Sequence, residues 1–332
     1  MKNCSNEIRY FSMFTGVGGF ELGLENCAKC VGFSEIDKFA CELLKNKFPN
    51  IKNYGDATKI NPSELPDFDI LCGGFPCQAF SIAGKRRGFK DTRGTLFFEI
   101  ARIIEVKKPR LVFLENVKGL LNHNKGETFS IIIQTLSELG YDVQWMVLNS
   151  KFFGVPQNRE RVFIIGSIRG TSRQEILPFR YSDTEDINLK QIGQVGEKDN
   201  MGQRIYDVDG IGTSIRSQGG GQGAKTGLYK INSATKKGYS EATIGDGIRL
   251  EYPESKTARG RVIKGNANTL KSGTEGVVDK DMKIRRLTPT ECERLQGFPD
   301  GWTEGFSDTQ RYKMMGNAVT VNVIKAIGEK LK

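Results

Sequence analysis

The sequence predicts an α/β protein with a mostly parallel, doubly wound sheet and a second, smaller domain rich in glycine. In the first half of the chain, short apolar runs alternate with amphipathic stretches, a pattern typical of repeated strand and helix units. Near Ser167 the chain becomes polar and glycine-rich, and after Ile284 its pattern is helical again. The length of 332 residues is sufficient for one sizeable core and a smaller appended domain.

The same alternation predicts the individual elements in order. The predicted strands are Ile8–Phe14, Val31–Glu35, Asp69–Cys72, Leu111–Glu115, Val143–Leu148 and Val162–Gly166. The predicted helices are Phe20–Cys27, Lys38–Phe48, Thr95–Val106, Glu127–Leu139, Thr288–Leu295 and Ala318–Leu331. Ligands of such sheets bind at the carboxyl ends of the strands, so the loops that follow the strands are the first place to look for chemistry.

Composition and charge narrow the class of protein. The net charge of +10 suggests a polyanionic partner, although solubility alone would also explain it. There is no run of about 18 apolar residues and no apolar signal core at the N-terminus, so we expect no membrane span and a cytoplasmic location. Seven cysteines, an odd number, indicate free thiols. The pair Cys27 and Cys30 lacks the further ligands of a zinc site, so we expect no metal.

Glycines follow the first predicted strand and open a helix within Phe14–Phe20. They let the backbone approach a cofactor closely, and the start of the helix offers unpaired N–H groups. Glu35 ends the next strand about 20 residues later, where an acid bonds ribose hydroxyls in nucleoside-binding folds. A plain tight turn is the alternative explanation for the glycines alone, and it explains the combination with Glu35 less well.

A cysteine, Cys77, lies on the loop that follows the third strand. A thiolate in that position is placed for nucleophilic attack once it is stabilised. The alternative, a small buried hydrophobe, suits Cys72 inside the strand better than Cys77 between Pro76 and Gln78. The next loop, Gly84–Gly94, carries five basic residues and one acidic residue, and it either closes over a phosphate backbone or is a solvated charged loop.

Two further positions carry charge at strand ends. Glu115 ends a strongly apolar strand, where an unpaired carboxylate would be costly, so we favour a functional role. Arg159 and Arg161 come just before the last predicted strand, Val162–Gly166. Because they are two residues apart, their side chains point the same way on an extended chain. They form either one cationic wall of a site or a surface ion-pair set with Glu160.

Taken together, five ordered blocks resemble the cytosine-C5 DNA methyltransferases of bacteria and phages. The blocks are Phe14–Gly19, Gly74–Gln78, Glu115–Val117, Gln157–Arg161 and Gly316–Val319, and Arg286–Pro299 also looks like a motif of that family. The resemblance implies a Rossmann-like, S-adenosylmethionine-dependent methyltransferase fold. In that fold 1–167 plus 284–332 would form the catalytic and cofactor-binding domain, and 168–283 the target-recognition domain.

The resemblance also implies a covalent mechanism in which the target cytosine is flipped out of duplex DNA. Cys77 would add to C6 of the base and make C5 electron-rich. Glu115 would bond N3 and the exocyclic amine, while Arg161, with Arg159 nearby, would bond the O2 side and favour the thiolate. The sequence names no base for the C5 proton.

By the same resemblance, S-adenosylmethionine is the cofactor. Its site would be formed by Phe14, Gly16, Gly18, Gly19, Glu35, Ile36, Asp56, Ala57, Pro76, Leu96, Asn317 and Val319. Glu35 would take the ribose hydroxyls, Ile36 would pack on the adenine, and Asp56 would accept from the adenine amine.

Double-stranded DNA is the expected partner. The expected DNA contacts are Gln78, Ser81, Lys85, Arg87, Arg204, Ser214, Gly220, Gly221, Arg261 and Thr269. The stretch from Arg204 to Gly227 looks like the recognition region of Hha-type methylases, which read GCGC. The sequence departs from that region at Met201, just before the stretch, and at Gln218 within it. About 40 residues from Ser233 to Gly273 have no counterpart there. We therefore expect a G/C-rich target site, but not GCGC itself.

Two alternatives come from other functional classes. A minority branch of the family methylates a tRNA cytosine, but its insert is short, unlike the long segment here from Ser167 to Lys283. A DNA-binding regulator on a decayed methylase scaffold should have lost Cys77 or Glu115 first, and both are present. We further expect a monomer, with a cognate restriction endonuclease in the same cell.

Overall fold

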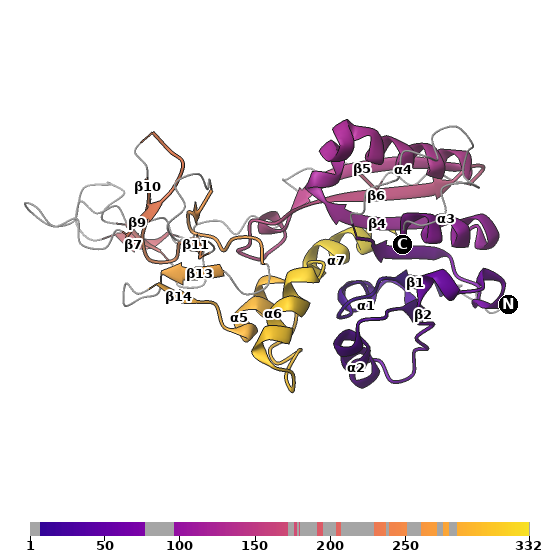
Figure 1. Ribbon diagram of the computed structural model, residues 1–332, viewed down its shortest axis with the longest axis horizontal. Helices are drawn as coiled ribbons and strands as arrows, with labels where there is room; N and C mark the ends of the chain where they lie inside the picture. Colours follow the sequence, from indigo (N-terminus) through magenta and orange to yellow (C-terminus); the bar gives the residue numbers. More distant parts are fainter. Residues whose placement is uncertain are drawn as a thin grey trace, which may run out of the picture. The chain divides into compact units, whose positions relative to one another are not determined.

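The computed structural model of the chain describes residues 7–76, 96–171, 176–177, 179, 191–194, 204–206, 229–236, 239–250, 260–270, 275–278 and 284–331 (Figure 1). The chain divides into two compact units. The first unit is Met1–Asn149, Glu160–Arg180 and Ala318–Lys332, and the second is Ser150–Arg159 and Tyr181–Asn317. None of the helices in these described ranges is long and apolar enough to cross a membrane.

The first unit is built on a six-stranded sheet with the order β2-β1-β3-β4-β6-β5. The strands are β1 (Arg9–Met13), β2 (Lys29–Ser34), β3 (Ile70–Gly74), β4 (Leu111–Val117), β5 (Tyr141–Asn149) and β6 (Glu160–Ile168). The strands β2, β1, β3 and β4 pair in parallel. The strand β6 runs in the opposite direction, because it pairs antiparallel with both β4 and β5. The predicted mostly parallel sheet and its six strands are confirmed.

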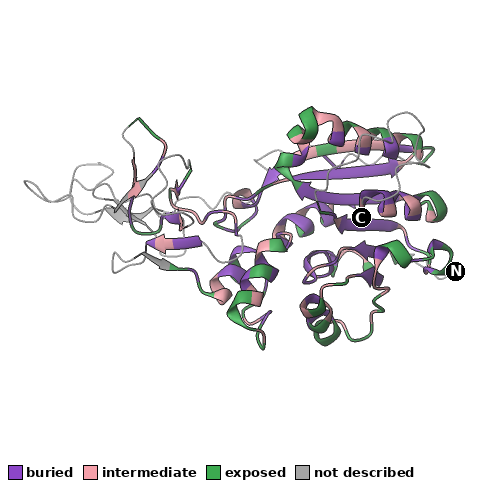
Figure 2. Ribbon diagram, viewed as in Figure 1, coloured by how far each residue is buried: buried purple, intermediate pink, exposed green. Residues whose placement is uncertain are grey.

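Burial explains why these segments are strands. The first six residues of β4 are buried, as expected for a central strand covered on both faces, whereas β5 at the edge is mostly half-buried (Figure 2). The helices among the described residues of this unit are α1 (Gly19–Leu24), α2 (Lys38–Lys47), α3 (Leu96–Lys107), α4 (Glu127–Glu138) and α7 (Val321–Glu329). Asp37 caps α2 by accepting from the backbone N–H groups of Phe39 and Ala40.

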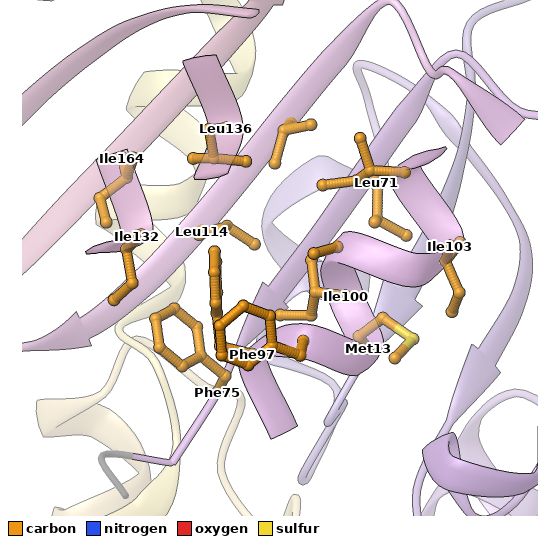
Figure 3. Close-up of a cluster of buried hydrophobic side chains, with 14 of the residues drawn as sticks. Met13, Leu71, Phe75, Phe97, Ile100, Ile103, Leu114, Ile132, Leu136 and Ile164 are labelled. Carbon is orange, nitrogen blue, oxygen red and sulfur yellow. The ribbon is translucent and has the colours of Figure 1, made fainter. Parts of the chain in front are cut away.

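Helices cover both faces of the sheet. On one face, Phe97 and Ile100 of α3 and Ile132 of α4 pack with Leu71 and other strand residues in one continuous apolar core (Figure 3). On the other face, the ring of Phe20 on α1 meets the ring of Phe113 on β4, with centroids 5.1 Å apart. The sequence-predicted doubly wound arrangement follows directly from this alternation of side chains along each strand.

The C-terminal helix α7 lies beside α1, although the two come from opposite ends of the chain (Figure 1). Contact is close because Gly23 has no side chain: a Cβ there would lie 2.6 Å from Cβ of Ile324 and 3.1 Å from the carbonyl oxygen of Val321. The last helix is thereby brought back against the first helix of the chain.

In its described residues, the second unit contains short antiparallel sheets and the helices α5 and α6. Its strands are β7 (Gln191–Gln194), β8 (Arg204–Tyr206), β9 (Tyr229–Asn232), β10 (Tyr239–Ala242), β11 (Gly247–Arg249), β12 (Val262–Ile263), β13 (Glu275–Val278) and β14 (Ile284–Arg286). They form the pairs β7-β8 and β10-β9 and the sheet β12-β11-β13-β14. Its helices are α5 (Pro289–Leu295) and α6 (Asp308–Asn317). Thr288 and Glu291 form a capping box at the start of α5, where the sequence predicts a helix start.

The compact units have other bounds than the two domains that the family resemblance implies. Residues 284–317 belong to the second unit, whereas the resemblance groups them with the catalytic domain. The reason is local bonding: β14 pairs with β13, Gln157 donates to the carbonyl oxygen of Leu295, and Gln296 donates to that of Met315. The assignment of functions to 1–167 plus 284–332 and to 168–283 stays a prediction.

The packing of α1 on α7 generates a stability prediction. Gly23→Ala normally strengthens a helix, but here the added methyl overpacks the contact with Ile324, so we expect a loss of about 1–3 kcal/mol. The matched control is Gly119→Ala, because a Cβ at Gly119 meets only Val117, at 4.0 Å. Thermal unfolding followed by circular dichroism measures both, and equal melting temperatures would contradict this account of the α1–α7 contact.

Candidate active site

The loop after β1 has a backbone that few sequences can adopt. Phe14 has φ +55°, Gly16 +60° and Gly18 +88°, all in the left-handed region. At Gly18 a Cβ would lie 2.7 Å from a ring carbon of Phe48, so that position requires glycine for two reasons. At Gly16 a Cβ would meet nothing within 4 Å, which leaves the backbone there open to a ligand.

Glu35, at the end of β2, holds this loop in place. Its Oε2 accepts from the backbone N–H of Gly16 at 2.7 Å. Its Oε1 accepts from the N–H groups of Ile36 and Asp37, each at 2.8 Å. The predicted cofactor acid thus joins the carboxyl ends of two adjacent parallel strands and has a structural role beside the predicted one.

Two further predicted cofactor residues follow in the same unit. The side chain of Ile36 is 71% exposed, an unusual position for a large apolar group and one that a planar ring could cover. Asp56 accepts from the backbone N–H of Thr58 at 3.0 Å and from its hydroxyl at 2.8 Å, and these bonds lower the pKa of Asp56. Asp56 therefore caps a turn in which the predicted contact Ala57 is buried.

The ends of β3 and β4 meet the C-terminal segment. Gly74 of β3 is paired in register with Glu115 of β4. A Cβ at Gly74 would lie 3.1 Å from Oε2 of Glu115 and 3.6 Å from Cγ1 of Val319. Val319, predicted from the far end of the chain, therefore does come beside the sheet's carboxyl edge. Pro76 is exposed after β3, and Leu96 begins α3.

A buried ion pair lies at this edge. Nε of Arg161 is 3.0 Å from Oε1 of Glu115, and the two side chains are only 14% and 10% exposed. Burial lowers the pKa of Arg161, and the neighbouring Glu115 carboxylate opposes that change. An arginine keeps its proton under such conditions, so the site holds a charged donor next to a carboxylate that it orients.

Asn116 is the residue that the sequence did not single out for a role. It is buried, and its Nδ2 donates to the carbonyl oxygen of Phe75 at 2.8 Å while its Oδ1 accepts from the N–H of Val117. It therefore fixes the backbone two residues before Cys77. The sequence shows an Asn after Glu115, but nothing in it shows a partner 41 positions earlier.

Two further predicted site residues, Arg159 and Asn317, belong to the second unit. Arg159 is 2% exposed and donates to the carbonyl oxygen of Gly316 at 3.1 Å. Asn317 ends α6. Glu293, fully buried, accepts from the backbone N–H groups of Gly301 and Thr303 and pairs with Arg311, so it organises the turn after α5.

The predicted DNA contacts are only partly described. Cys77, Gln78, Ser81, Lys85, Arg87, Ser214, Gly220 and Gly221 lie outside the described residues. Arg204 begins β8 opposite Gln194 of β7. Arg261 is 2% exposed and donates to the carbonyl oxygen of Arg249, and Thr269 donates to that of Asn158. Burial of Arg261 disfavours the predicted direct DNA contact, because its guanidinium would have to leave this position to reach a base.

The loop after β1 and the ends of β2 and β4 together indicate a class of enzyme. A left-handed glycine loop, an acid that ends the next strand and an exposed apolar side chain beside that acid are what a parallel sheet needs to bind a nucleoside. At the same edge of the sheet, the carboxylate of Glu115 is oriented by the buried guanidinium of Arg161. Such a carboxylate is suited to holding a polar group that gains charge in a reaction. The first unit therefore has the plan of a nucleoside-cofactor α/β enzyme. Within the described part of the chain, no three His, Cys, Asp or Glu side chains gather where they could hold a metal ion.

Comparison with known proteins identifies the family. The family model described as C-5 cytosine-specific DNA methylase matches residues 8–332. The chain is 42% identical over 327 residues to the type II methyltransferase M1.ScrFI of Lactococcus lactis subsp. cremoris, a match covering 97% of this chain and 77% of that protein. It is 35% identical over 354 residues to M.HhaI of Haemophilus parahaemolyticus, covering 96% and 93%. The chain belongs to the C-5 cytosine-specific DNA methylases, which makes it an enzyme that methylates cytosine in DNA at C5.

A solved structure supports the fold independently. A DNMT2 mutant of Spodoptera frugiperda matches with a TM-score of 0.59 at 18% identity, covering 98% of this chain and 99% of that one. At this identity the likeness concerns the fold alone, and it agrees with the mostly parallel sheet described above.

The bond from Asn116 to Phe75 generates the prediction for this site. Asn116→Ala should lower the rate of methyl transfer by about 10²-fold, since it releases the backbone that carries Cys77. The matched control is Tyr141→Phe, which removes another buried bond to a backbone carbonyl, that of Pro109, just before β4 begins. The control should cost about 1 kcal/mol of stability and leave the rate unchanged. Turnover of both variants with duplex DNA, with folding checked by circular dichroism, is the measurement; equal rates would refute a positioning role for Asn116.

Proposed function

We propose that the enzyme methylates a flipped cytosine through a covalent bond between Cys77 and C6 of the base. The observation that carries this proposal is the buried pair of Glu115 and Arg161 at the edge where β3 leads into Cys77. Cytosine C5 becomes nucleophilic only when a thiolate adds to C6, and that addition places charge on the ring. A carboxylate and a guanidinium fixed at one edge are what such a ring requires.

Each residue of the pair has its own part in the proposed step. Glu115 bonds N3 and the exocyclic amine and stabilises the ring as the sulfur–C6 bond forms. Arg161 orients Glu115 and bonds the O2 side, and Arg159 is the second cationic residue of this proposal. After the methyl group reaches C5, loss of the C5 proton returns an electron pair to the ring and expels the Cys77 thiolate, so the sulfur–C6 bond breaks and the enzyme is regenerated.

We propose S-adenosylmethionine as the cofactor, bound by the glycine loop and the ends of β1 to β4. The residues fit it: Gly16 leaves room at the loop, Ile36 offers an exposed apolar surface, and Glu35 fixes the loop against β2. When bound there, the cofactor supplies an electrophilic methyl group. Asp56, Ala57, Pro76, Leu96, Asn317 and Val319 are the further contacts of this proposal.

We infer that residues 168–283 read the DNA sequence and that the basic segment Gly84–Gly94 contacts the DNA backbone. Guanine edges in the major groove offer two acceptors that an Arg side chain matches, which favours Arg204 and a G/C-rich site. Lys85 and Arg87 are suited to phosphates, which position DNA without specifying it. Gln78, Ser81, Ser214, Gly220, Gly221 and Thr269 complete the proposed contacts.

The biological setting is also a proposal. M1.ScrFI and M.HhaI are named type II methyltransferases, which supports a restriction–modification system with a cognate endonuclease in the same cell. The cytoplasm, in association with the nucleoid, and a monomeric state are what we expect for such an enzyme.

The first prediction here tests the covalent step. Cys77→Ser should abolish methyl transfer while DNA binding persists, because a hydroxyl is a far weaker nucleophile at neutral pH. With 5-fluorocytosine at the target, the wild-type enzyme should be trapped on DNA through Cys77, since fluorine does not leave as a cation. Denaturing gels with labelled duplex DNA detect the adduct; substantial turnover by the variant or no adduct with the wild type would overturn the mechanism.

The second prediction tests the cofactor site. Glu35→Ala should weaken S-adenosylmethionine binding by about 1.5–3 kcal/mol and leave DNA affinity nearly unchanged, because it removes a charge-assisted bond to the ribose. Glu42→Ala, which removes an exposed acid from α2, is the control. Titration calorimetry gives both affinities, and unaltered cofactor affinity would mean that Glu35 does not contact the ribose.

The third prediction separates reading from positioning. Arg204→Ala should cost about 1–3 kcal/mol and relax the choice of one base pair. Lys85→Ala and Arg87→Ala should weaken binding to all sequences alike and flatten the salt dependence. Selection from a randomised DNA library gives the site preference of each variant; an unchanged preference in Arg204→Ala would assign that residue to the phosphates.

A further inference from the structure

An unsatisfied acid is buried directly behind the cofactor loop. Glu21 lies in the first turn of α1 and is 3% exposed. Neither of its carboxylate oxygens has a hydrogen bond of ordinary geometry among the described residues, and the groups that favour its charged form are the Ser12 hydroxyl and its own backbone N–H. A buried carboxylate without a donor or a countercharge costs free energy, so such a group needs an explanation.

The groups that face Glu21 come from three strands of the sheet. They are Tyr10 and Ser12 on β1, Cys30 on β2 and Cys72 on β3, and Glu35 interacts with it through charge. None of these groups is a cation. The helix α7 packs on α1 through Ile324, and its charged side chains Lys325 and Glu329 are exposed.

Burial raises the pKa of Glu21 from 4.5 to about 7, while Ser12 acts in the opposite direction. At neutral pH the carboxyl is therefore divided between its neutral and charged forms. A nearby positive charge would favour the charged form and lower this pKa again.

Glu21 is linked to the glycine loop on two sides. The hydroxyl of Thr15, in the loop, donates to the hydroxyl of Ser12 at 3.2 Å, and Ser12 faces Glu21. Glu35, whose charge raises the pKa of Glu21, accepts from Gly16 of the same loop. The missing countercharge of Glu21 and the cofactor loop thus belong to one small region of the first unit.

We propose that Glu21 is a specificity-determining residue for the cofactor, whose ionised carboxylate favours the sulfonium cation of S-adenosylmethionine over the neutral thioether product. The proposal rests on the proposed use of S-adenosylmethionine. The cofactor and its demethylated product share the adenosine, the ammonium and the carboxylate, and they differ by one positive charge and one methyl group. An unpaired buried acid is the residue that would sense that charge, and it would aid product release.

The sign of the pH dependence follows from linkage. If a cationic ligand lowers the pKa of Glu21, binding releases a proton, and affinity rises with pH up to the pKa of about 7 in the ligand-free enzyme. For a decrease of about one pKa unit on binding, affinity for S-adenosylmethionine at pH 6 is about fivefold weaker than at pH 8. The product, which lacks the sulfonium, should show no such loss. The α-amino group titrates near pH 8 in both ligands and cancels in their ratio.

The experiment is titration calorimetry of S-adenosylmethionine and S-adenosylhomocysteine at pH 6 and pH 8. The ratio of the two affinities should favour S-adenosylmethionine about fivefold more at pH 8 than at pH 6 in the wild type. In Glu21→Gln, which has the same shape and no charge, the ratio should not change with pH. Glu25→Gln removes an exposed acid just after the same helix and should behave like the wild type.

A second measurement uses the wild-type enzyme alone, so it does not depend on the variant folding. Titrations at pH 6.5 in buffers of different ionisation enthalpy should show release of about half a proton with S-adenosylmethionine and less with S-adenosylhomocysteine. A pH-independent ratio and equal proton release would overturn the role of Glu21. Failure of the wild type to bind S-adenosylmethionine at all would instead overturn the proposed cofactor.

Discussion

The parallel direction of β2, β1, β3 and β4 is the constraint on which the site depends. Because these four strands run the same way, their carboxyl ends meet at one edge of the sheet. The glycine loop, Glu35, the segment that leads to Cys77 and Glu115 each follow or end one of these strands. Residues far apart in sequence are thereby brought to one edge of the sheet.

The pair of Glu115 and Arg161 shows why this edge must be rigid. Taking two charges out of water is expensive, and their attraction offsets that cost only when the geometry is good. The antiparallel pairing of β4 with β6 places Arg161 opposite Val117, two residues beyond Glu115 on the same strand, so the backbone brings the two side chains into reach. A pair of this kind contributes little to stability and much to orientation, which is consistent with a place in the reaction.

The sequence was most informative where burial is one-sided or complete. The strand Leu111–Glu115 was predicted from the continuous apolar run of its first four residues, and the alternation of such runs with helical patterns predicted the parallel sheet. Glu115 and Arg161 could be named because charges at the ends of apolar strands are conspicuous. Asn116 and Glu21 could not be given roles, since Asn116 bonds a residue 41 positions away and the burial of Glu21 arises from three separate strands. The bounds of the second compact unit have no signature in the composition either, because β14 joins that unit through its pairing with β13.

Three glutamates of the first unit differ only in what surrounds them. Glu35 accepts from three backbone N–H groups and Glu115 is paired with a guanidinium, so each has a reason to be charged. Glu21 lies one helical turn from the same loop and has neither, and its burial, aided by the charge of Glu35, raises its pKa towards neutrality. A neutral side chain of the same shape would cost less free energy in that position. An acid there makes physical sense when a positive charge arrives in the working enzyme, and the sulfonium of the proposed cofactor is a charge that arrives with the cofactor and is lost in the reaction.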